Sequence, residues 1–97
     1  MGHRVAPGAR LDLAEPWHYV ASDRSVETAD RLIDSITARF FLLGNHPQAG
    51  SRRDELRPGL RSFPIGAYVV LYRIEGSDVL IQHVTRGSRD LESLLGE

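Results

Sequence analysis

Residues 67–84 read AYVVLYRIEGSDVLIQHV, and this stretch contains two runs of apolar, β-branched and aromatic residues. The run over residues 67–74 is apolar on both faces, which is typical of a central strand covered on both sides. The residues at 75–78 favour a tight turn, and residues 79–84 supply the returning strand. The stretch therefore predicts a β-hairpin within an antiparallel sheet.

The segment before this hairpin is rich in turn residues. Residues 44–66 contain seven of the chain's fourteen glycines and prolines, so we expect loops around short extended pieces. Neither side of the segment is long enough to fold alone. Residues 1–97 are therefore expected to form a single domain.

A helix is the strongest prediction in the first half of the chain. Apolar residues recur at three- and four-residue steps from about Val26 to Leu43 and form one stripe. We expect Ser25 to cap the N-terminus of this helix and Gly44 to stand just past its end in a left-handed conformation.

A second, shorter helix is predicted over residues 11–22, with Asp12 as its cap and Pro16 within its first turn. Residues 3–6 are expected to form a short strand, and residues 88–95 a short helix or an ordered arm. The order of these elements predicts an α+β fold. It has a short N-terminal strand, two helices packed on one face of a small antiparallel sheet, and a C-terminal helix or arm.

The composition excludes several classes of mechanism. All twelve basic residues are arginine, and the chain has neither lysine nor cysteine. This excludes Schiff bases, lysine acids or bases, disulfides, thiolate zinc sites and cysteine nucleophiles. The net charge of −1 argues against sequence-independent binding of nucleic acid. No run of apolar residues is long enough to span a membrane, and the first ten residues lack the apolar core of a signal peptide. We therefore expect a cytoplasmic protein.

No motif for catalysis or metal binding emerges from the remaining residues. The spacing of the histidines does not match a zinc site, and no metal or cofactor is expected; they are His3, His18, His46 and His83. No serine lies in a nucleophile elbow. Two interpretations of the arginines and tyrosines in the second half stay open. They form a surface that binds carboxylates or phosphates, or the arginines are solvated and the tyrosines pack in the core. Residues 39–74 carry six Arg against two acids.

The sequence resembles a known family. Residues 55–73, ELRPGLRSFPIGAYVVLYR, followed by residues 81–84 and 86–90, are similar to the ParE branch of the ParE/RelE toxin superfamily. Further segments match in the same order, namely residues 11–17, 29–30 and 47–50. The resemblance implies a type II toxin with DNA gyrase as its target and a ParD-like antitoxin as its partner. It implies no membrane partner and no nucleic acid bound by the toxin alone.

The resemblance also implies which residues meet these partners. Arg86, Arg89 and Asp90, with the C-terminal arm, are expected to bind the target. The antitoxin is expected to cover a surface shaped by four residues, Arg57, Arg61, Arg73 and Tyr72. One of the residues expected to bind the target departs from the family pattern, since Arg86 stands where ParE-like chains commonly have His. A second departure is Pro16, in a helix that usually lacks proline.

RelE-like members of the superfamily cleave messenger RNA on the ribosome with Lys, Arg and a C-terminal Tyr. In this chain Val69 stands where Arg is expected, no Tyr follows Tyr72, and only Arg89 matches. Arginine stays protonated and is a poor proton shuttle, so we assign no catalytic residue and do not expect an enzyme. Two alternatives stay open: a ribosome-dependent endoribonuclease of RelE type, and a non-toxic relic that still binds an antitoxin.

Overall fold

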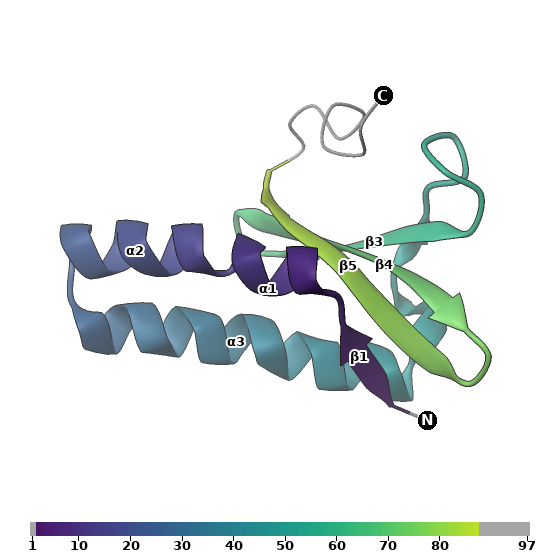
Figure 1. Cartoon of the computed structure of the whole chain (residues 1–97), viewed down its shortest axis with the longest axis horizontal. Coiled ribbons are helices and arrows are strands. Elements are labelled where there is room, and N and C mark those ends of the chain that lie inside the picture. The colour runs from purple at the N-terminus through teal and green to yellow at the C-terminus, as the bar shows by residue number, and fades with distance from the viewer. Residues whose placement is uncertain (1, 88–97) are drawn as a thin grey trace.

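The computed structural model describes residues 2–87 (Figure 1). The predicted C-terminal helix or arm lies outside these residues. The elements follow in the order β1 (His3–Val5), α1 (Pro7–Asp12), α2 (Ala14–Asp23), α3 (Val26–Asn45), the 3-10 turn η1 (Pro47–Ala49), β2 (Ser51–Arg52), β3 (Leu60–Ile65), β4 (Tyr68–Glu75) and β5 (Asp78–Arg86).

The strands form one sheet in the order β1-β5-β4-β3-β2. Strands β2 to β5 pair antiparallel, whereas β1 lies parallel to β5 and makes the sheet mixed. Parallel neighbours need a long connection, and here the helices and the remaining strands supply it. The predicted α+β fold, with helices on one face of a small sheet, is confirmed (Figure 1).

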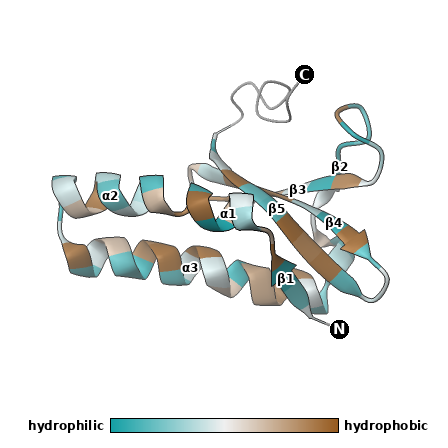
Figure 2. Ribbon diagram, in the orientation of Figure 1, coloured by the Kyte–Doolittle hydropathy of each residue, from teal (hydrophilic) through white to brown (hydrophobic). Residues whose placement is uncertain are grey.

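Strand β4 is buried on both faces, as its apolar run predicts. Val70 and Tyr72 face the helices and belong to the main core, together with Phe40 of α3. Leu71 faces the opposite side and forms a smaller cluster with Leu60 of β3. Figure 2 shows the hydrophobic stripes of the helices and of β4 and β5 that make up this interior.

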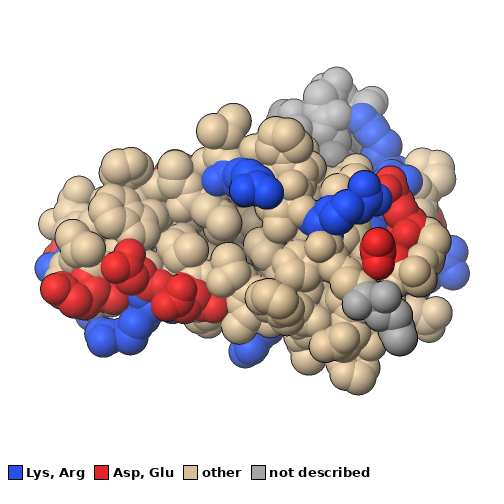
Figure 3. Space-filling view, turned by 60° about the horizontal axis from the view of Figure 1, so that its bottom comes forward, with Lys and Arg blue, Asp and Glu red and all other residues tan. Residues whose placement is uncertain are grey.

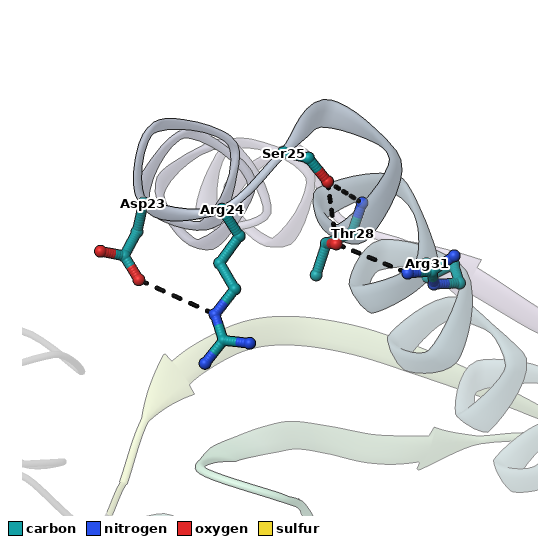
Figure 4. Close-up of polar contacts among 5 residues, drawn as sticks. All are labelled: Asp23, Arg24, Ser25, Thr28 and Arg31. Atoms are coloured by element: carbon teal, nitrogen blue, oxygen red, sulfur yellow. Dashed lines mark hydrogen bonds and ion pairs between the residues drawn. The ribbon is translucent and has the colours of Figure 1, made fainter.

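The predicted N-cap of α3 is confirmed. The Ser25 Oγ accepts a hydrogen bond from the Thr28 amide at 3.0 Å and donates to the Thr28 hydroxyl at 2.9 Å (Figure 4). Because one of the unpaired amides of the first turn is satisfied in this way, the helix has a defined start. Arg31 donates to the same hydroxyl at 3.5 Å.

The predicted C-cap of α3 is wrong. Gly44 is a buried residue inside the helix, which ends at Asn45 and is capped by His46. An added Cβ at residue 44 would lie 3.0 Å from the carbonyl carbon of Gly2, so the glycine is needed for a close approach of the N-terminal segment. A sequence pattern reads Gly near a helix end as a cap, but here packing decides.

The helix predicted over residues 11–22 corresponds to two helices in the structure, α1 and α2. Helix α1 begins at Pro7, earlier than residue 11, because proline is favoured at the first helical position. Asp12 does not cap α2 as predicted. Its Oδ2 accepts a hydrogen bond from the Val84 amide at 3.0 Å and lies 3.2 Å from the Nδ1 of His83. The carboxylate thus ties α1 to β5. Pro16 does lie in the first turn of α2.

Helices α2 and α3 form an antiparallel pair whose far end is acidic. The indole Nε1 of Trp17 donates to the Asp30 carboxylate at 2.8 Å and joins the two helices. Figure 3 shows acidic side chains gathered at the end of the molecule that these helices form. Among residues 2–87, no helix combines the length and the apolar character needed to cross a membrane.

Two helical glycines give a matched test of the packing. An added Cβ at Gly8 would meet nothing closer than 3.5 Å. We therefore expect Gly8→Ala to raise the free energy of unfolding by up to about 1 kcal/mol, the usual helix-propensity gain. Gly44→Ala is expected to lower it by about 1 kcal/mol, because Gly2 must move. Urea denaturation measures both, and equal stabilisation by the two changes would contradict the packing.

Candidate partner-binding surface

Tyr72 joins the sheet to the loop that follows α3. Its side chain is completely buried, and its hydroxyl donates to the Pro47 carbonyl at 2.6 Å and accepts from the Gly50 amide at 2.9 Å. A Cβ at residue 50 would lie 2.6 Å from this hydroxyl, so only glycine fits there. Burial raises the pKa of Tyr72. The neutral hydroxyl therefore holds η1 in place.

Arg61 supports the same loop. It is the cross-strand partner of Tyr72, so both side chains lie on the helix-covered face of the sheet. Its Nη1 donates to the Gly50 carbonyl at 2.7 Å, so both the amide and the carbonyl of Gly50 are held. The positive charge of Arg61 favours the phenolate and partly opposes the rise in the pKa of Tyr72.

Arg73 and Arg57 occupy other positions. Arg73 is paired with Leu60 on the opposite face of the sheet, and its Nε is buried without a hydrogen-bond partner in the part of the chain that is described. Arg57 lies in the loop over residues 53–59, and its Nη1 donates to the Leu56 carbonyl at 3.3 Å. The four residues predicted to meet an antitoxin thus do not form one cluster. Tyr72 has no exposed surface, and it shapes the protein surface through the loop it holds.

The loop over residues 53–59 is organised by charge. Arg52 pairs with Asp54 at 2.8 Å, and Arg53 pairs with Glu55 at 2.7 Å. The Gly59 amide donates to the other Asp54 oxygen at 2.9 Å. This hydrogen bond, with Arg52 beside it, lowers the pKa of Asp54. The pair between Arg52 and Asp54 is exposed and therefore easily exchanged for other partners.

Arg86 lies exposed near the end of the described residues. Its guanidinium carbon is 5.4 Å from the centre of the Tyr19 ring, which is a cation–π contact with α2. Gly87 follows with a positive φ of 66°, and its amide donates to the Ala67 carbonyl at 2.6 Å. These contacts fix where the chain leaves the sheet. Arg89 and Asp90, the other residues predicted to meet the target, lie outside the described residues.

The histidines have structural surroundings. His83 contacts Asp12, and the His3 ring packs edge-on against Phe41 with centroids 4.7 Å apart. Over residues 2–87, no group of three or more His, Cys, Asp or Glu side chains could hold a metal ion.

A shallow groove crosses the end of the sheet beside η1, and sequence reasoning missed it. It consists of two hollows that share Ile74, which is 36% exposed. One hollow lies between η1 and Gly76, and the other is lined by Arg52, Asp54, Gly59, Leu60 and Arg61. We call this feature the Ile74 groove. The available signal was the place of Ile74, two residues before a turn glycine at the end of a strand whose centre is buried.

Comparisons with known proteins all lead to one family of toxins. The family model described as "ParE toxin of type II toxin-antitoxin system, parDE" matches residues 4–91. Toxin ParE3 of Caulobacter vibrioides is 35% identical over 86 residues, which cover 89% of this chain and 86% of the relative. Toxin ParE1 of the same organism is 31% identical over 94 residues, 97% of each chain.

Solved structures share the fold. A chain of the chromosomal ParDE system from P. aeruginosa superposes with a TM-score of 0.79 at 19% identity, over 91% of this chain and 97% of that one. A chain of the toxin–antitoxin complex RelBE2 from Mycobacterium tuberculosis gives a TM-score of 0.61 at 25% identity, over 88% and 95% of the two chains. At 19% identity the first likeness shows the fold alone.

The hydroxyl of Tyr72 can be tested by its removal. We expect Tyr72→Phe to lower the free energy of unfolding by about 2 kcal/mol, because the Pro47 carbonyl and the Gly50 amide lose their partner. Urea denaturation at neutral pH measures this loss. A change below the error of the method would show that the hydroxyl does not hold the loop.

Wild type and Tyr72→Phe should also differ in how their stability depends on pH. The pKa of Tyr72 is higher in the folded than in the unfolded state, so its contribution to stability is complete below pH of about 10 and is lost as the pH rises further. Wild type should therefore lose stability more steeply than Tyr72→Phe above that pH. Parallel curves would contradict the raised pKa.

Proposed function

We propose a function for this chain on the premise that it belongs to the ParE family of toxins from type II toxin–antitoxin systems. It stops growth by binding DNA gyrase, and a ParD-like antitoxin neutralises it. The observation that carries the proposal is the match to the family over residues 4–91, together with identities of 35% and 31% to two ParE toxins. Gyrase as the target and ParD as the partner follow from the resemblance to ParE toxins.

The proposed action is binding rather than catalysis. The resemblance to RelE-like members implies that a ribonuclease of this type would use Lys, Arg and a Tyr near the C-terminus. The chain has no lysine, and Tyr72 is buried with its hydroxyl engaged on both sides. Arginine can stabilise charge but stays protonated. These features support the gyrase-binding alternative over the nuclease alternative.

Arg86 is the described residue proposed to contact the target. It is exposed, held over Tyr19, and followed directly by the segment that contains Arg89 and Asp90. A guanidinium group is suited to carboxylates because it binds them with two parallel hydrogen bonds. We therefore place the target contact at the end of β5 and in the residues that follow.

The antitoxin is proposed to cover other parts of the surface. Arg57, Arg61 and Arg73 remain candidates, although the structure distributes them over two faces of the sheet. Several large apolar side chains are exposed on the helices, with Leu11 at 75% and Phe41 at 65%. Side chains of this kind serve as anchors for an amphipathic partner segment.

The proposal predicts growth arrest with a defined cause. Expression of the chain without a partner should stop growth and raise gyrase-linked DNA breaks, and purified protein should inhibit gyrase supercoiling. Arg86→Ala should weaken gyrase binding by about tenfold without lowering stability, because Arg is a frequent hot-spot residue. Arg24→Ala is the matched control, since Arg24 is also exposed but lies just past the C-terminal end of α2.

Three outcomes would redirect the proposal. Arrest without gyrase inhibition, but with new cleavages in translated messages, identifies a ribosome-dependent nuclease. Folded protein without arrest identifies the non-toxic relic. If arrest occurs, a genomic library screened for genes that restore growth identifies the antitoxin, and failure to recover a neutralising protein contradicts the toxin–antitoxin assignment.

A further inference from the structure

Tyr19 is an aromatic residue of α2 that lies against the end of β5. It is 56% exposed, so burial in the core does not account for its place. The guanidinium carbon of Arg86 lies over its ring, 5.4 Å from the ring centre. A guanidinium within about 6 Å of a ring centroid is attracted to the negative face of the ring. Tyr19 thus contacts, from a different element, the described residue that is proposed to bind the target.

The backbone of Arg86 is fixed by the sheet. Arg86 is the cross-strand partner of Tyr68, at the open end of the hairpin that β4 and β5 form. The next residue, Gly87, donates its amide to the Ala67 carbonyl at 2.6 Å. The sheet therefore sets where the Arg86 side chain begins, and the contact with Tyr19 sets the direction in which it extends.

The hydrogen-bonding groups of Arg86 are open. A guanidinium carries five N–H donors, and attraction to an aromatic ring does not use them up. Within residues 2–87, Arg86 makes no hydrogen bond or ion pair. A carboxylate that approaches Arg86 can therefore accept two parallel hydrogen bonds while the contact with Tyr19 persists.

Other exposed arginines differ from Arg86 in this respect. Arg4 pairs with Glu75 at 2.8 Å, and Arg52 pairs with Asp54 at the same distance. An arginine that is paired with an acid of its own chain must exchange that partner before it binds another carboxylate. Arg86 is held in place without such a partner, so it needs no exchange.

Ordering in advance matters for a side chain as long as arginine. Its conformational entropy is among the largest of all side chains, and much of it is lost when the side chain is fixed in a complex. A contact that already restricts the side chain in the free protein reduces this loss. The strength of an exposed cation–π contact corresponds to about two- to fivefold in affinity.

We propose that Tyr19 is a positioning residue for target binding, because it holds the Arg86 guanidinium over its ring with the N–H groups open to a carboxylate of the target. Tyr19 acts through Arg86. The inference rests on the proposed function and adds to it a second element, α2, and a residue that sequence reasoning did not select.

The test compares variants of the full-length protein in the inhibition of gyrase supercoiling. Tyr19→Leu removes the aromatic ring but keeps an apolar side chain with good helix propensity, so α2 should be preserved. It should weaken inhibition by about two- to fivefold. Tyr19→Phe keeps the ring and is the matched control, which should inhibit as well as wild type. Urea denaturation of each variant confirms that it folds.

A double-mutant cycle shows whether Tyr19 acts through Arg86. In the Arg86→Ala background, Tyr19→Leu should cause no further loss of inhibition, because the cation that the ring holds is gone. A loss of the same size in both backgrounds would mean that Tyr19 acts independently of Arg86. That result would overturn the inference.

NMR of the free protein provides an independent measurement. The ring current of Tyr19 should move the side-chain proton resonances of Arg86 upfield, since the guanidinium lies over the ring. This displacement should disappear in Tyr19→Leu and persist in Tyr19→Phe. Arg86 resonances that are the same in wild type and in Tyr19→Leu would show that the ring does not hold the side chain, which also overturns the inference.

The outcomes separate this inference from the proposed function. If wild type inhibits gyrase and Tyr19→Leu inhibits it equally well, the positioning role is wrong while gyrase stands as the target. If folded wild type does not inhibit gyrase, the proposed function fails and the inference is overturned with it.

Discussion

The burial of β4 on both faces is the constraint on which the rest of the structure depends. One face needs the cover that α1 and α3 provide through residues such as Phe40. The other face needs the loop over residues 53–59, whose Leu56 packs on Leu60 and Leu71. Since a chain of this size has room for only one substantial core, the other elements are arranged around this strand, either in contact with it or through elements that pack on its neighbours. The open end of β4 at Ile74 is where that cover stops.

Much of the fold could be predicted from local patterns. Helix α3, the hairpin and the N-cap at Ser25 follow from periodicity and turn chemistry, which depend on neighbours in sequence. The errors at Gly44 and Asp12 have a common cause. Gly44 is set by its approach to Gly2, and Asp12 by its bond to Val84, and each contact joins segments far apart in the sequence. Local rules carry no information about such pairs.

The binding roles assigned to the candidate residues stay predictions. The period of two placed Tyr72 on the same face as Val70, as the structure has it. It could not show that the Tyr72 hydroxyl is used internally, because its partners, Pro47 and Gly50, lie in a loop. The Ile74 groove could not be predicted from the sequence for a similar reason. An apolar residue in a strand indicates burial, and its exposure depends on where the neighbouring strand begins.

The pairing of β1 with β5 has a consequence for synthesis of the protein on the ribosome. Within residues 2–87, strand β1 pairs with β5 alone, and the Gly2 carbonyl accepts a hydrogen bond from the Val79 amide. Because β5 lies between β1 and β4, a nascent chain that ends before residue 78 lacks the strand that joins the two. Products truncated before residue 78 therefore cannot pair β1 with the rest of the sheet, and the five-stranded sheet arises only after translation of β5.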